Sequence, residues 1–502
     1  MIDRRNLFME LMSSIGLNPK IENYINGKLV PGIGQTITLI DPYTTDELTN
    51  YKDATAILAQ EACNAASSAQ SIWFNDYNAS SRGQLMQQVS FEINKNMENI
   101  AKLEAVISGK PVKDCRVEIS KVAEMFSYYS GWADKLHGEV IPVPSGHLNY
   151  TLREPLGVIF QVTPWNAPAF TAGWQIAPAI AAGNAVVIKP SELTPATTVV
   201  LAMLGEKAGL PKGLVNVLCG YGNTTGQAAI QSEEVRKVIF VGSPSTGCIV
   251  ATSAAKALKP AVLELGGKSA NVVFDDSNLE HACLGAQAAI FSSAGQSCVS
   301  GSRLLIQKNI FDELTSMISQ GMTLIKLGDP LLEDTEIGPI SNFKQFTHIK
   351  NILAIAESEG ASLSRNKNIP KSGYFVSPTL IKGLKNSSIP AQNEIFGPVV
   401  TAIPFETEEE AVSIANDTQF GLAGAVWTQN IGRAHRISSK VRAGTFWINS
   451  YKAIHVSSPF GGSLNSGFGR SSGYDALLEY TAPKSIWLDK NETPQIAFGY
   501  TP

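Results

Sequence analysis

The sequence predicts an α/β protein built on a doubly wound parallel sheet, and three observations support this fold class. Between Gly157 and Gly242, short apolar stretches alternate with helical segments, a rhythm typical of parallel strands joined by helices. At 502 residues the chain exceeds one ordinary domain. Its residues are 44% hydrophobic and 17% charged, the balance of a globular protein with a large core. We therefore expect two or three domains.

The N-terminal part is expected to form hairpins and long helices before this alternation begins. Residues 24–50 read as short strands, and the Asn26–Gly27 pair marks a hairpin turn between two of them. Residues 54–135 are rich in alanine and predict long helices, and residues 140–155 return to an extended pattern. Near the N-terminus Glu10 interrupts a short apolar stretch, so no signal peptide is predicted. The apolar side chains there share one helical face: Phe8, Leu11, Met12 and Ile15.

The alternating region places polar and glycine-rich segments where its strands end. Parallel sheets bind ligands at the carboxyl ends of their strands, so we expect a ligand site formed by Lys189–Glu192, Gly220–Gly222 and Gly242–Ser243. Beyond Cys298 a second α/β region continues to about residue 450. The strands are predicted at 157–163, 184–189, 214–219 and 237–242, and the helices at 174–182, 194–209 and 226–232.

Charge and cysteine usage exclude several classes of function. The net charge of −4 shows no basic excess for binding nucleic acid. No stretch reaches the roughly 18 uninterrupted apolar residues of a membrane span. None of the six cysteines has CxxC spacing, and no His/Cys cluster suggests a metal site. A cytoplasmic protein with reduced thiols is the simplest interpretation.

One cysteine stands in a setting that favours chemistry. Cys298 lies among small polar residues between Gly295 and Gly301, where a substrate can approach the backbone closely. A nucleophilic thiol needs such access, together with a base or positive field that holds it as thiolate. We would then expect a thiol reagent to label one cysteine quickly at neutral pH. The alternative is an inert core cysteine, the commoner case for a single Cys.

An acidic residue and an amide are the other two candidates. Glu264 interrupts an apolar run before a glycine pair, and a carboxyl in apolar surroundings can act as a general base near neutral pH. Its alternative is a strand-end residue that faces water. Asn166 lies between two prolines in Thr163-Pro-Trp-Asn-Ala-Pro, a rigid loop that can hold an amide donor in place. Taken alone, Asn166 is more often an ordinary turn residue.

Taken together, these segments resemble the aldehyde dehydrogenase superfamily, in its hydrolytic, non-CoA-acylating form. Leu263-Glu264-Leu-Gly-Gly-Lys and Gly295-Gln-Ser-Cys298 are similar to the family's glutamate and cysteine signatures, and their 34-residue spacing is similar too. The motifs around Asn166, Gly242–Gly247 and Glu394-Ile-Phe-Gly-Pro398 extend the resemblance from about Tyr24 to about Lys484.

The resemblance implies a division of the chain and an assembly. It implies a Rossmann-like NAD-binding domain at 1–134 and 153–264, an α/β catalytic domain at 265–463, and a small β oligomerisation arm at 135–152 and 478–502. The apolar strand-like tail at 480–487 supports an arm that pairs with another chain, because an unpaired apolar edge strand is an aggregation hazard. A homodimer or homotetramer is expected, with no nucleic-acid or membrane partner.

The resemblance also implies the catalytic and cofactor residues. Cys298 would be the nucleophile, Glu264 the base for water, and Asn166 with the Cys298 amide the oxyanion hole. A carboxylate at Glu192 would repel a 2′-phosphate, which favours NAD, with NADP as the alternative. No metal is needed. The implied cofactor contacts are Val162, Thr163, Pro164, Trp165, Lys189, Glu192, Gly222, Gly226, Phe240, Gly242, Ser243, Leu265, Glu394 and Phe396.

Two alternatives to a hydrolytic enzyme stay open. A CoA-acylating semialdehyde dehydrogenase is disfavoured by Glu264, which such members commonly lack. A non-catalytic binding or structural protein on the same scaffold would be expected to have lost at least one of the matching residues. Many relatives carry a Lys and a Glu where this chain has Gln175 and Ser471, so the proton of the general base must leave by another route.

The residues expected to line a substrate tunnel also depart from many relatives. Ala167 replaces a frequent aromatic residue and should widen the tunnel, and Thr171 should make it more polar. A medium-sized or aromatic aldehyde is therefore favoured over acetaldehyde. His455 and Lys452 are interpreted as solvated loop residues at its mouth. The complete predicted lining is Ala167, Phe170, Thr171, Trp174, Ile454 and Phe460.

Overall fold

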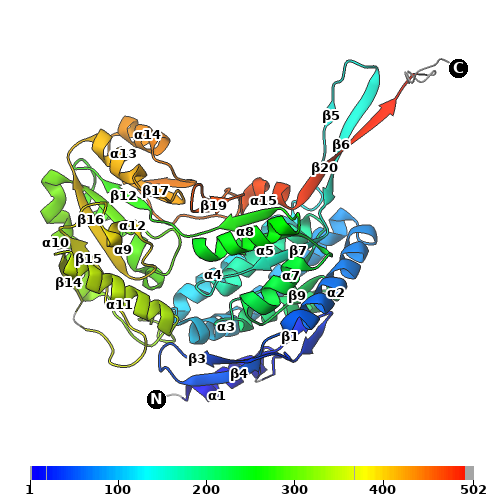
Figure 1. Cartoon of the computed structure of the whole chain (residues 1–502), viewed down its shortest axis with the longest axis horizontal. Coiled ribbons are helices and arrows are strands. Elements are labelled where there is room, and N and C mark those ends of the chain that lie inside the picture. Colours follow the sequence, from blue (N-terminus) through cyan, green and yellow to red (C-terminus); the bar gives the residue numbers. More distant parts are fainter. Residues whose placement is uncertain (1–2, 19, 367, 492–502) are drawn as a thin grey trace.

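The computed structural model describes residues 3–18, 20–366 and 368–491. Two large sheets with covering helices form the body, and a narrow three-stranded sheet projects from it (Figure 1). The predicted arm segment 478–502 lies only in part within the described residues, because 492–502 fall outside them.

The first sheet confirms the predicted doubly wound arrangement. Its strand order is β19-β11-β10-β7-β8-β9-β1-β2, and β7 to β11 are parallel to one another. The chain runs outward from β7 through β8 to β9 and then returns to β10 on the other side of β7. Such a reversal of strand order is where open α/β sheets bind ligands. The parallel strands are β7 (Val158–Val162), β8 (Ala185–Lys189), β9 (Val215–Val217), β10 (Val235–Val241) and β11 (Ala261–Glu264).

The edges of this sheet are antiparallel. On one edge β1 (Asn23–Ile25) and β2 (Lys28–Val30) form the predicted hairpin, and Asn26 and Gly27 turn it with φ of 49° and 76°. On the other edge β19 (Gly467–Phe468) pairs with β11, next to Glu264. A separate hairpin of β3 (Thr36–Ile40) and β4 (Glu47–Lys52) follows the first one.

The helices around the first sheet follow the predicted order, with two differences in their bounds. The helix predicted at 174–182 begins earlier, at Pro168, because proline is well suited to the first turn of a helix. The helix predicted at 226–232 opens with a single π-turn, η1 (Gly222–Gly226). The helices are α1 (Arg4–Ser14), α2 (Thr55–Asn75), α3 (Ala79–Ser108), α4 (Val112–Ser130), α5 (Pro168–Ala181), α6 (Ala196–Lys207), α7 (Gln227–Gln231) and α8 (Pro244–Lys256).

The second α/β region forms its own sheet, in the order β14-β15-β16-β13-β12-β17-β18. Its strands are parallel except β14. The strands are β12 (Ala270–Val273), β13 (Arg303–Gln307), β14 (Ser362–Arg365), β15 (Thr379–Lys382), β16 (Val399–Phe405), β17 (Ala423–Trp427) and β18 (Thr445–Ile448). The helical segments are α9 (Leu279–Phe291), η2 (Ser292–Gly295), η3 (Lys308–Ile310), α10 (Phe311–Leu324), α11 (Phe343–Ser358), α12 (Ile389–Gln392), α13 (Glu408–Asn416) and α14 (Ile431–Lys440). The last helix, α15 (Gly473–Glu479), packs against α5 at the first sheet.

The projecting sheet is made from two distant segments of the chain. β20 (Thr481–Asp489) pairs antiparallel with β6 (His147–Pro155), which pairs in turn with β5 (Val140–Ile141). Figure 1 shows it standing clear of the body. Val140 is 74% exposed and Trp487 57% exposed, so apolar side chains face outward along it.

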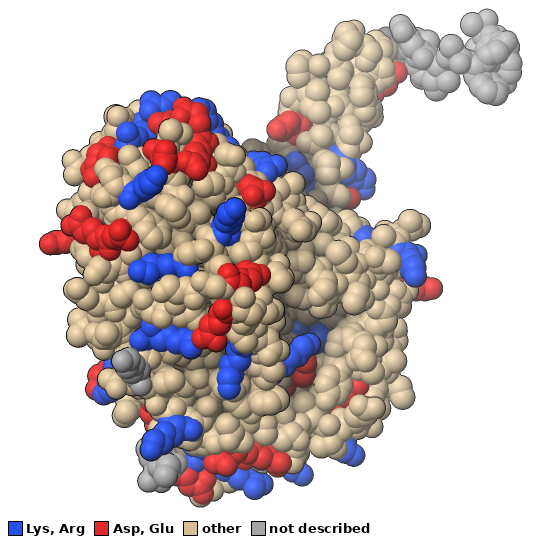
Figure 2. Space-filling view, turned by 60° about the vertical axis from the view of Figure 1, so that its left-hand side comes forward, with Lys and Arg blue, Asp and Glu red and all other residues tan. Residues whose placement is uncertain are grey.

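Charges of both signs are mixed on the face shown in Figure 2. Figure 2 shows Lys and Arg interspersed with Asp and Glu on the face turned to the viewer, without a broad basic area on the described residues seen there. Among the described residues, no helix is both long and apolar enough to cross a membrane.

Candidate active site

The loops that carry Glu264 and Cys298 lie side by side between the two sheets. The chain leaves β11 through Gly266 and Gly267, and a Cβ on Gly267 would lie 2.7 Å from the carbonyl oxygen of Cys298. Before Cys298, Ser293 and Ala294 adopt left-handed backbone conformations, with φ of 52° and 54°. A Cβ on Gly295 would lie 2.0 Å from the Gly397 carbonyl oxygen. Both approaches are possible only because glycine has no side chain.

The thiol of Cys298 is held protonated in this structure. Burial raises its pKa to about 12, and the negative charges of Glu394 and Glu264 act in the same direction. The structure therefore differs from the thiolate that the sequence predicts at neutral pH. The reason is that burial disfavours the charged thiolate, and the charges of the two carboxyl groups add to this effect.

Glu264 is a buried carboxyl with one hydrogen bond. Its exposed fraction is 4%, which excludes the alternative of a strand-end residue facing water. The Ser471 hydroxyl donates to its Oε1 at 3.0 Å, and Oε2 has no partner among the described residues. Burial raises the pKa of Glu264 to about 8, partly offset by the Ser471 hydrogen bond. A carboxyl with this pKa can exchange protons near neutral pH.

Replacing Ser471 by alanine is expected to move this pKa further upward. In the wild-type protein this hydrogen bond stabilises the carboxylate form of Glu264, and hydrogen bonds to charged groups contribute about 1.5–3 kcal/mol. We expect the ascending limb of the pH–rate profile for thioester hydrolysis to shift to higher pH by about one pH unit or more. Ser471→Thr keeps a hydroxyl and should stay close to the parent profile. An unshifted profile in Ser471→Ala would show that this hydrogen bond does not tune the carboxyl.

Asn166 lies where the sequence predicts it, next to the cysteine loop. Its side-chain amide donates one N–H to the carbonyl oxygen of Gln296 at 2.9 Å, two residues before Cys298. This hydrogen bond fixes the amide beside the thiol and leaves its second N–H for another acceptor. Asn166 is therefore more than an ordinary turn residue, because it connects the loop after β7 to the cysteine loop.

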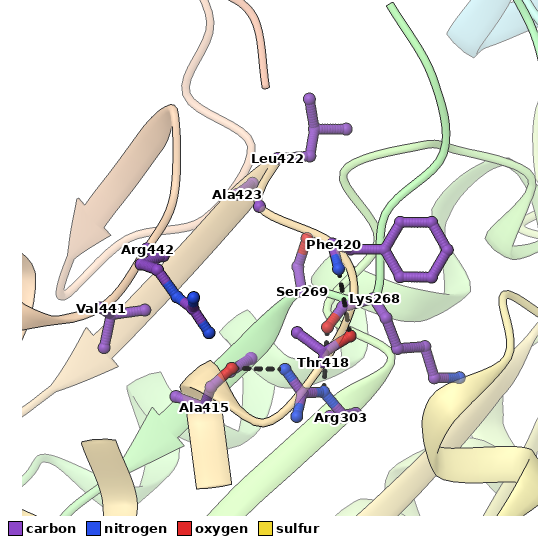
Figure 3. A pocket seen from close by; sticks show the side chains of 12 residues that line it. Lys268, Ser269, Arg303, Ala415, Thr418, Phe420, Leu422, Ala423, Val441 and Arg442 are labelled. Carbon is purple, nitrogen blue, oxygen red and sulfur yellow. Dashed lines mark hydrogen bonds between the residues drawn. The ribbon is translucent and has the colours of Figure 1, made fainter. Parts of the chain in front are cut away.

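A buried arginine ties the glutamate loop to the second sheet. The Arg303 guanidinium donates to the carbonyl oxygens of Lys268 at 2.9 Å, Ile414 at 2.7 Å and Ala415 at 2.7 Å, and Figure 3 draws the first and last of these acceptors. The last two acceptors lie at the C-terminal end of α13, where a cation also meets the negative end of the helix dipole. Lys268, in contrast, is buried, and its ammonium has no hydrogen-bond partner among the described residues.

The predicted cofactor residues of the first sheet gather at the carboxyl ends of β7, β8 and β10. Thr163 donates its backbone N–H to the Lys189 carbonyl oxygen at 3.1 Å, and Gly242 donates its own to the Glu264 carbonyl oxygen at 3.1 Å. Ser243 caps the 13-residue helix α8. A helix N-terminus with free backbone N–H groups favours a phosphate. The sheet thus brings Val162, Thr163, Pro164, Trp165, Phe240, Gly242, Ser243 and Leu265 to one edge.

Lys189 and Glu192 follow β8 at the same edge. The buried Lys189 ammonium donates to the carbonyl oxygens of Pro190 at 2.8 Å and Gly220 at 2.9 Å, which leaves one N–H for a ligand. Glu192 is half-buried two residues beyond Pro190. A Cβ on Gly222 would meet nothing within 4 Å, and Gly226 faces the Lys189 side chain. The glycine-lined space beside Lys189 therefore remains open to a ligand.

Glu394 and Phe396, which precede β16 of the second sheet, contact residues that follow β11 and β7 of the first sheet. Glu394 accepts a hydrogen bond from the Gly267 N–H at 3.0 Å, and burial raises its pKa to about 7. Phe396 adopts a left-handed conformation with φ of 52°, and its ring packs edge-on against Trp165 with centroids 5.3 Å apart. Residues in such rarely populated conformations concentrate at functional sites. Glu394 is half-buried and hydrogen-bonded rather than an exposed surface acid.

An aromatic cluster confirms that several predicted tunnel residues lie together. Trp174 packs against Phe170 with ring centroids 5.3 Å apart and against Phe460 at 4.9 Å. The Trp174 indole N–H donates to the Ser472 hydroxyl, next to the serine that holds Glu264. Ile454 packs against the same core as Phe170. Ala167 precedes α5, and Thr171 lies buried in its first turn.

Two polar residues of the loop near this cluster are interpreted from the sequence as solvated. His455 is 54% exposed and its Nε2 lies 2.8 Å from Glu124, as expected for a surface loop residue. Lys452 is half-buried, and burial lowers the pKa of its ammonium to about 8. Within the described residues, its Nζ is not among the buried atoms without a partner, which agrees with the interpretation of Lys452 as a loop residue whose charge meets solvent.

Gln175 is a further buried polar residue that the sequence left without a role. Its exposed fraction is 2%, and neither amide atom of its side chain has a partner among the described residues. Its backbone carbonyl accepts from the Gln161 side chain at 2.9 Å. Buried amides of this kind usually bind ordered water.

Comparisons with known proteins agree with this geometry. The family model described as "Aldehyde dehydrogenase family" matches residues 29–486. An aldehyde dehydrogenase of Emericella nidulans is 38% identical over 92% of this chain and 94% of its own. A betaine aldehyde dehydrogenase of Bacillus subtilis is 36% identical over 92% of this chain and 96% of its own. The crystal structure of betaine aldehyde dehydrogenase from Staphylococcus aureus in complex with NAD⁺ is similar with a TM-score of 0.95 and 35% identity, covering 99% of this chain and 100% of that one.

Proposed function

The chain belongs to the aldehyde dehydrogenase family, and on that premise we propose how its own residues oxidise an aldehyde to the carboxylic acid with NAD as hydride acceptor. We propose Cys298 as nucleophile, Glu264 as base and Asn166 as oxyanion donor. The observation that carries this proposal is the buried carboxyl of Glu264, close enough to Cys298 for its charge to raise the pKa of the thiol. A base and a nucleophile in one water-poor site are what thioester formation and hydrolysis require.

The residues at the edge of the first sheet fit a dinucleotide. The reversal of strand order between β7 and β10, the capped N-terminus of α8 and the open glycines beside Lys189 provide space and N–H donors for it. When bound, NAD supplies a hydride acceptor. The chain would hold it through the residues at the ends of β7, β8 and β10, with Glu394 and Phe396 closing over it from the second sheet.

The proposed reaction uses one residue for each step. The thiol of Cys298 gives its proton to water as its sulfur attacks the aldehyde carbon. The oxyanion that forms is held by the free N–H of the Asn166 amide and by the Cys298 backbone N–H, and one such donor contributes about 10²–10³ in rate. Loss of hydride converts the thiohemiacetal into a thioester. The Glu264 carboxylate then removes a proton from water, which attacks the thioester and releases the acid and the Cys298 thiol.

Cofactor choice, assembly and location complete the proposal. A carboxylate at Glu192 would repel a 2′-phosphate, which supports NAD over NADP. The exposed apolar side chains of the β5-β6-β20 sheet support a homodimer or homotetramer built through an arm at 135–152 and 478–502. The proposed NAD-binding domain comprises 1–134 and 153–264, and the proposed catalytic domain comprises 265–463. The six free cysteines support a reducing, cytoplasmic location.

A panel of aldehydes tests the proposed function. We expect NADH formation without coenzyme A, and a higher kcat/KM for benzaldehyde than for acetaldehyde, because Phe170, Trp174 and Phe460 offer aromatic contacts. The measurement is absorbance at 340 nm with aliphatic, aromatic, amino- and carboxy-aldehydes. Equal kcat/KM values for acetaldehyde and benzaldehyde would refute the proposed size preference.

Two controls separate the alternatives. The same panel with coenzyme A should give no faster turnover, since Glu264 activates water; strict dependence on coenzyme A would instead identify the acylating type. No turnover with any aldehyde, while NAD still binds, would favour a non-catalytic protein on this scaffold. Loss of NAD binding itself would refute the cofactor-site assignment.

A further inference from the structure

Asp53 is a buried carboxylate that binds one loop of the proposed cofactor site. It directly follows β4 and is 2% exposed. Its Oδ1 accepts hydrogen bonds from the Tyr221 backbone N–H at 2.8 Å and from the Thr225 hydroxyl at 2.8 Å, and its Oδ2 accepts one from the Thr224 hydroxyl at 2.7 Å. All three donors belong to the loop 220–226 between β9 and α7, so one side chain fixes most of this loop.

The loop 220–226 needs this support because its own sequence is permissive. Gly220, Gly222 and Gly226 leave its backbone many alternative conformations. Thr224 is exposed, and the loop ends in the π-turn η1, a geometry that is frequent at functional sites. A Cβ on Gly220 would lie 2.1 Å from the Asp53 Oδ1, so the loop backbone packs directly against the carboxylate.

The peptide group between Gly220 and Tyr221 connects Asp53 to Lys189. The N–H of this peptide donates to Asp53, and its carbonyl oxygen accepts from the Lys189 ammonium at 2.9 Å. A peptide group is planar and rigid, so the carboxylate that fixes its N–H also fixes the direction of its carbonyl. Hydrogen bonds in such a chain polarise and strengthen one another. Asp53 therefore determines where the Lys189 ammonium, which is 3% exposed, is held.

A second residue of β4 supports the other loop of the cofactor site. Tyr51 is 4% exposed, and its hydroxyl donates to the Glu192 carbonyl oxygen at 2.8 Å. Directly after Asp53, the Ala54 N–H donates to the Cys219 carbonyl oxygen at 3.1 Å, which fixes the end of β4 beside the end of β9. The end of β4 thus contacts both loops that follow β8 and β9.

We propose that Asp53 is a positioning residue for the adenosine half of NAD, because it holds the Gly220–Tyr221 peptide and, through it, the Lys189 ammonium in the orientation that binds the adenosine ribose. This inference rests on the proposed function and deepens its cofactor site. Asp53 acts through Lys189 and the loop 220–226 rather than by contact with the cofactor. No step of the proposed reaction uses Asp53, so its loss weakens NAD binding and leaves the chemistry of the NAD-saturated enzyme unchanged.

Substitution of Asp53 tests this inference with ADP, which carries the adenosine ribose and no nicotinamide. Asp53→Ala leaves three donors without their acceptor, so we expect the Kd for ADP and the KM for NAD to rise by about tenfold or more. The kcat at saturating NAD should stay at the wild-type value, as expected for loss of binding alone. Asp53→Asn keeps an oxygen acceptor and should restore most of the affinity. Calorimetric titration with ADP and NADH formation at varied NAD give the two sets of values.

The matched control is a second buried carboxylate next to the same hairpin. Asp41 directly follows β3 and is 1% exposed. It accepts hydrogen bonds from the Tyr43 backbone N–H at 2.8 Å and from the Thr44 hydroxyl at 3.2 Å. Neither donor belongs to a cofactor loop, so Asp41→Ala should keep the wild-type Kd for ADP.

Thr224→Val is a second variant that does not disturb the core, because Thr224 is exposed. It removes one of the three donors to Asp53, and we expect a smaller rise in the Kd for ADP, about two- to tenfold. An unchanged Kd for ADP in both variants would overturn the inference, and so would a kcat that falls as much as the KM for NAD rises. If no aldehyde is oxidised, the proposed function fails, and the ADP titration still decides the role of Asp53. A wild-type protein that does not bind ADP would overturn the inference together with the cofactor site.

Discussion

Replacing Cys298 by alanine is expected to abolish aldehyde oxidation, with kcat reduced by at least about 10⁴-fold, because no other group of the site can form the thioester. Binding of NAD should persist, since the proposed cofactor contacts lie on the first sheet and on Glu394 and Phe396. The measurement is NADH formation at 340 nm with the best aldehyde of the panel, alongside a binding titration with NAD. Residual turnover within tenfold of wild type would exclude Cys298 as the nucleophile.

The matched control for this substitution is another free cysteine. Cys248 is exposed on α8, and Cys248→Ala should keep wild-type turnover. The same variant removes the most accessible competing thiol from alkylation experiments. In that background, alkylation of Cys298 should accelerate about tenfold for each pH unit between pH 7 and pH 9, because its pKa of about 12 keeps it far below half-ionised. A rate independent of pH would show a thiolate already formed.

The fold could be predicted in considerable detail, because local patterns determine it. The strand–helix alternation after Gly157 predicts the parallel strands, and the Asn26–Gly27 pair predicts the hairpin that the structure contains. The start of α5 could not be placed from apolar periodicity alone, because Pro168 follows a loop whose path depends on Asn166 bonding to the distant Gln296. Contacts between residues 130 positions apart leave no local signal.

The sequence predicts which residues form the candidate site, but it does not predict their pKa values. The pKa of a group depends on which charges and how much water surround it in space. A sequence cannot show how burial and the charges of Glu394 and Glu264 combine at Cys298, so it does not predict the protonated thiol. In the sequence, Ser471 stands where many relatives carry a Glu. In the structure, its hydroxyl donates a hydrogen bond to Glu264.

Glu264→Gln should separate the two halves of the reaction. Thioester formation needs only the thiol and the oxyanion donors, so we expect a rapid burst of about one equivalent of NADH per site. Hydrolysis needs the carboxylate, and general-base catalysis contributes about 10²–10⁴, so steady-state turnover should fall by that factor. Stopped-flow absorbance at 340 nm resolves both phases. Glu104→Gln is the matched control, because Glu104 is an equally buried carboxyl whose pKa burial raises to about 7.

The pH dependence gives an independent test of the same role. The base must be ionised to act, and the pKa of Glu264 is raised to about 8, so hydrolysis should be slow at low pH and rise until the carboxyl is deprotonated. Between pH 7 and pH 8 the ionised fraction of such a group grows about fivefold, and steady-state turnover limited by hydrolysis should grow with it. In Glu264→Gln this rise should disappear while the burst remains. A rise that survives the substitution would assign the titration to another group, and steady-state hydrolysis as fast as wild type would remove Glu264 from the mechanism.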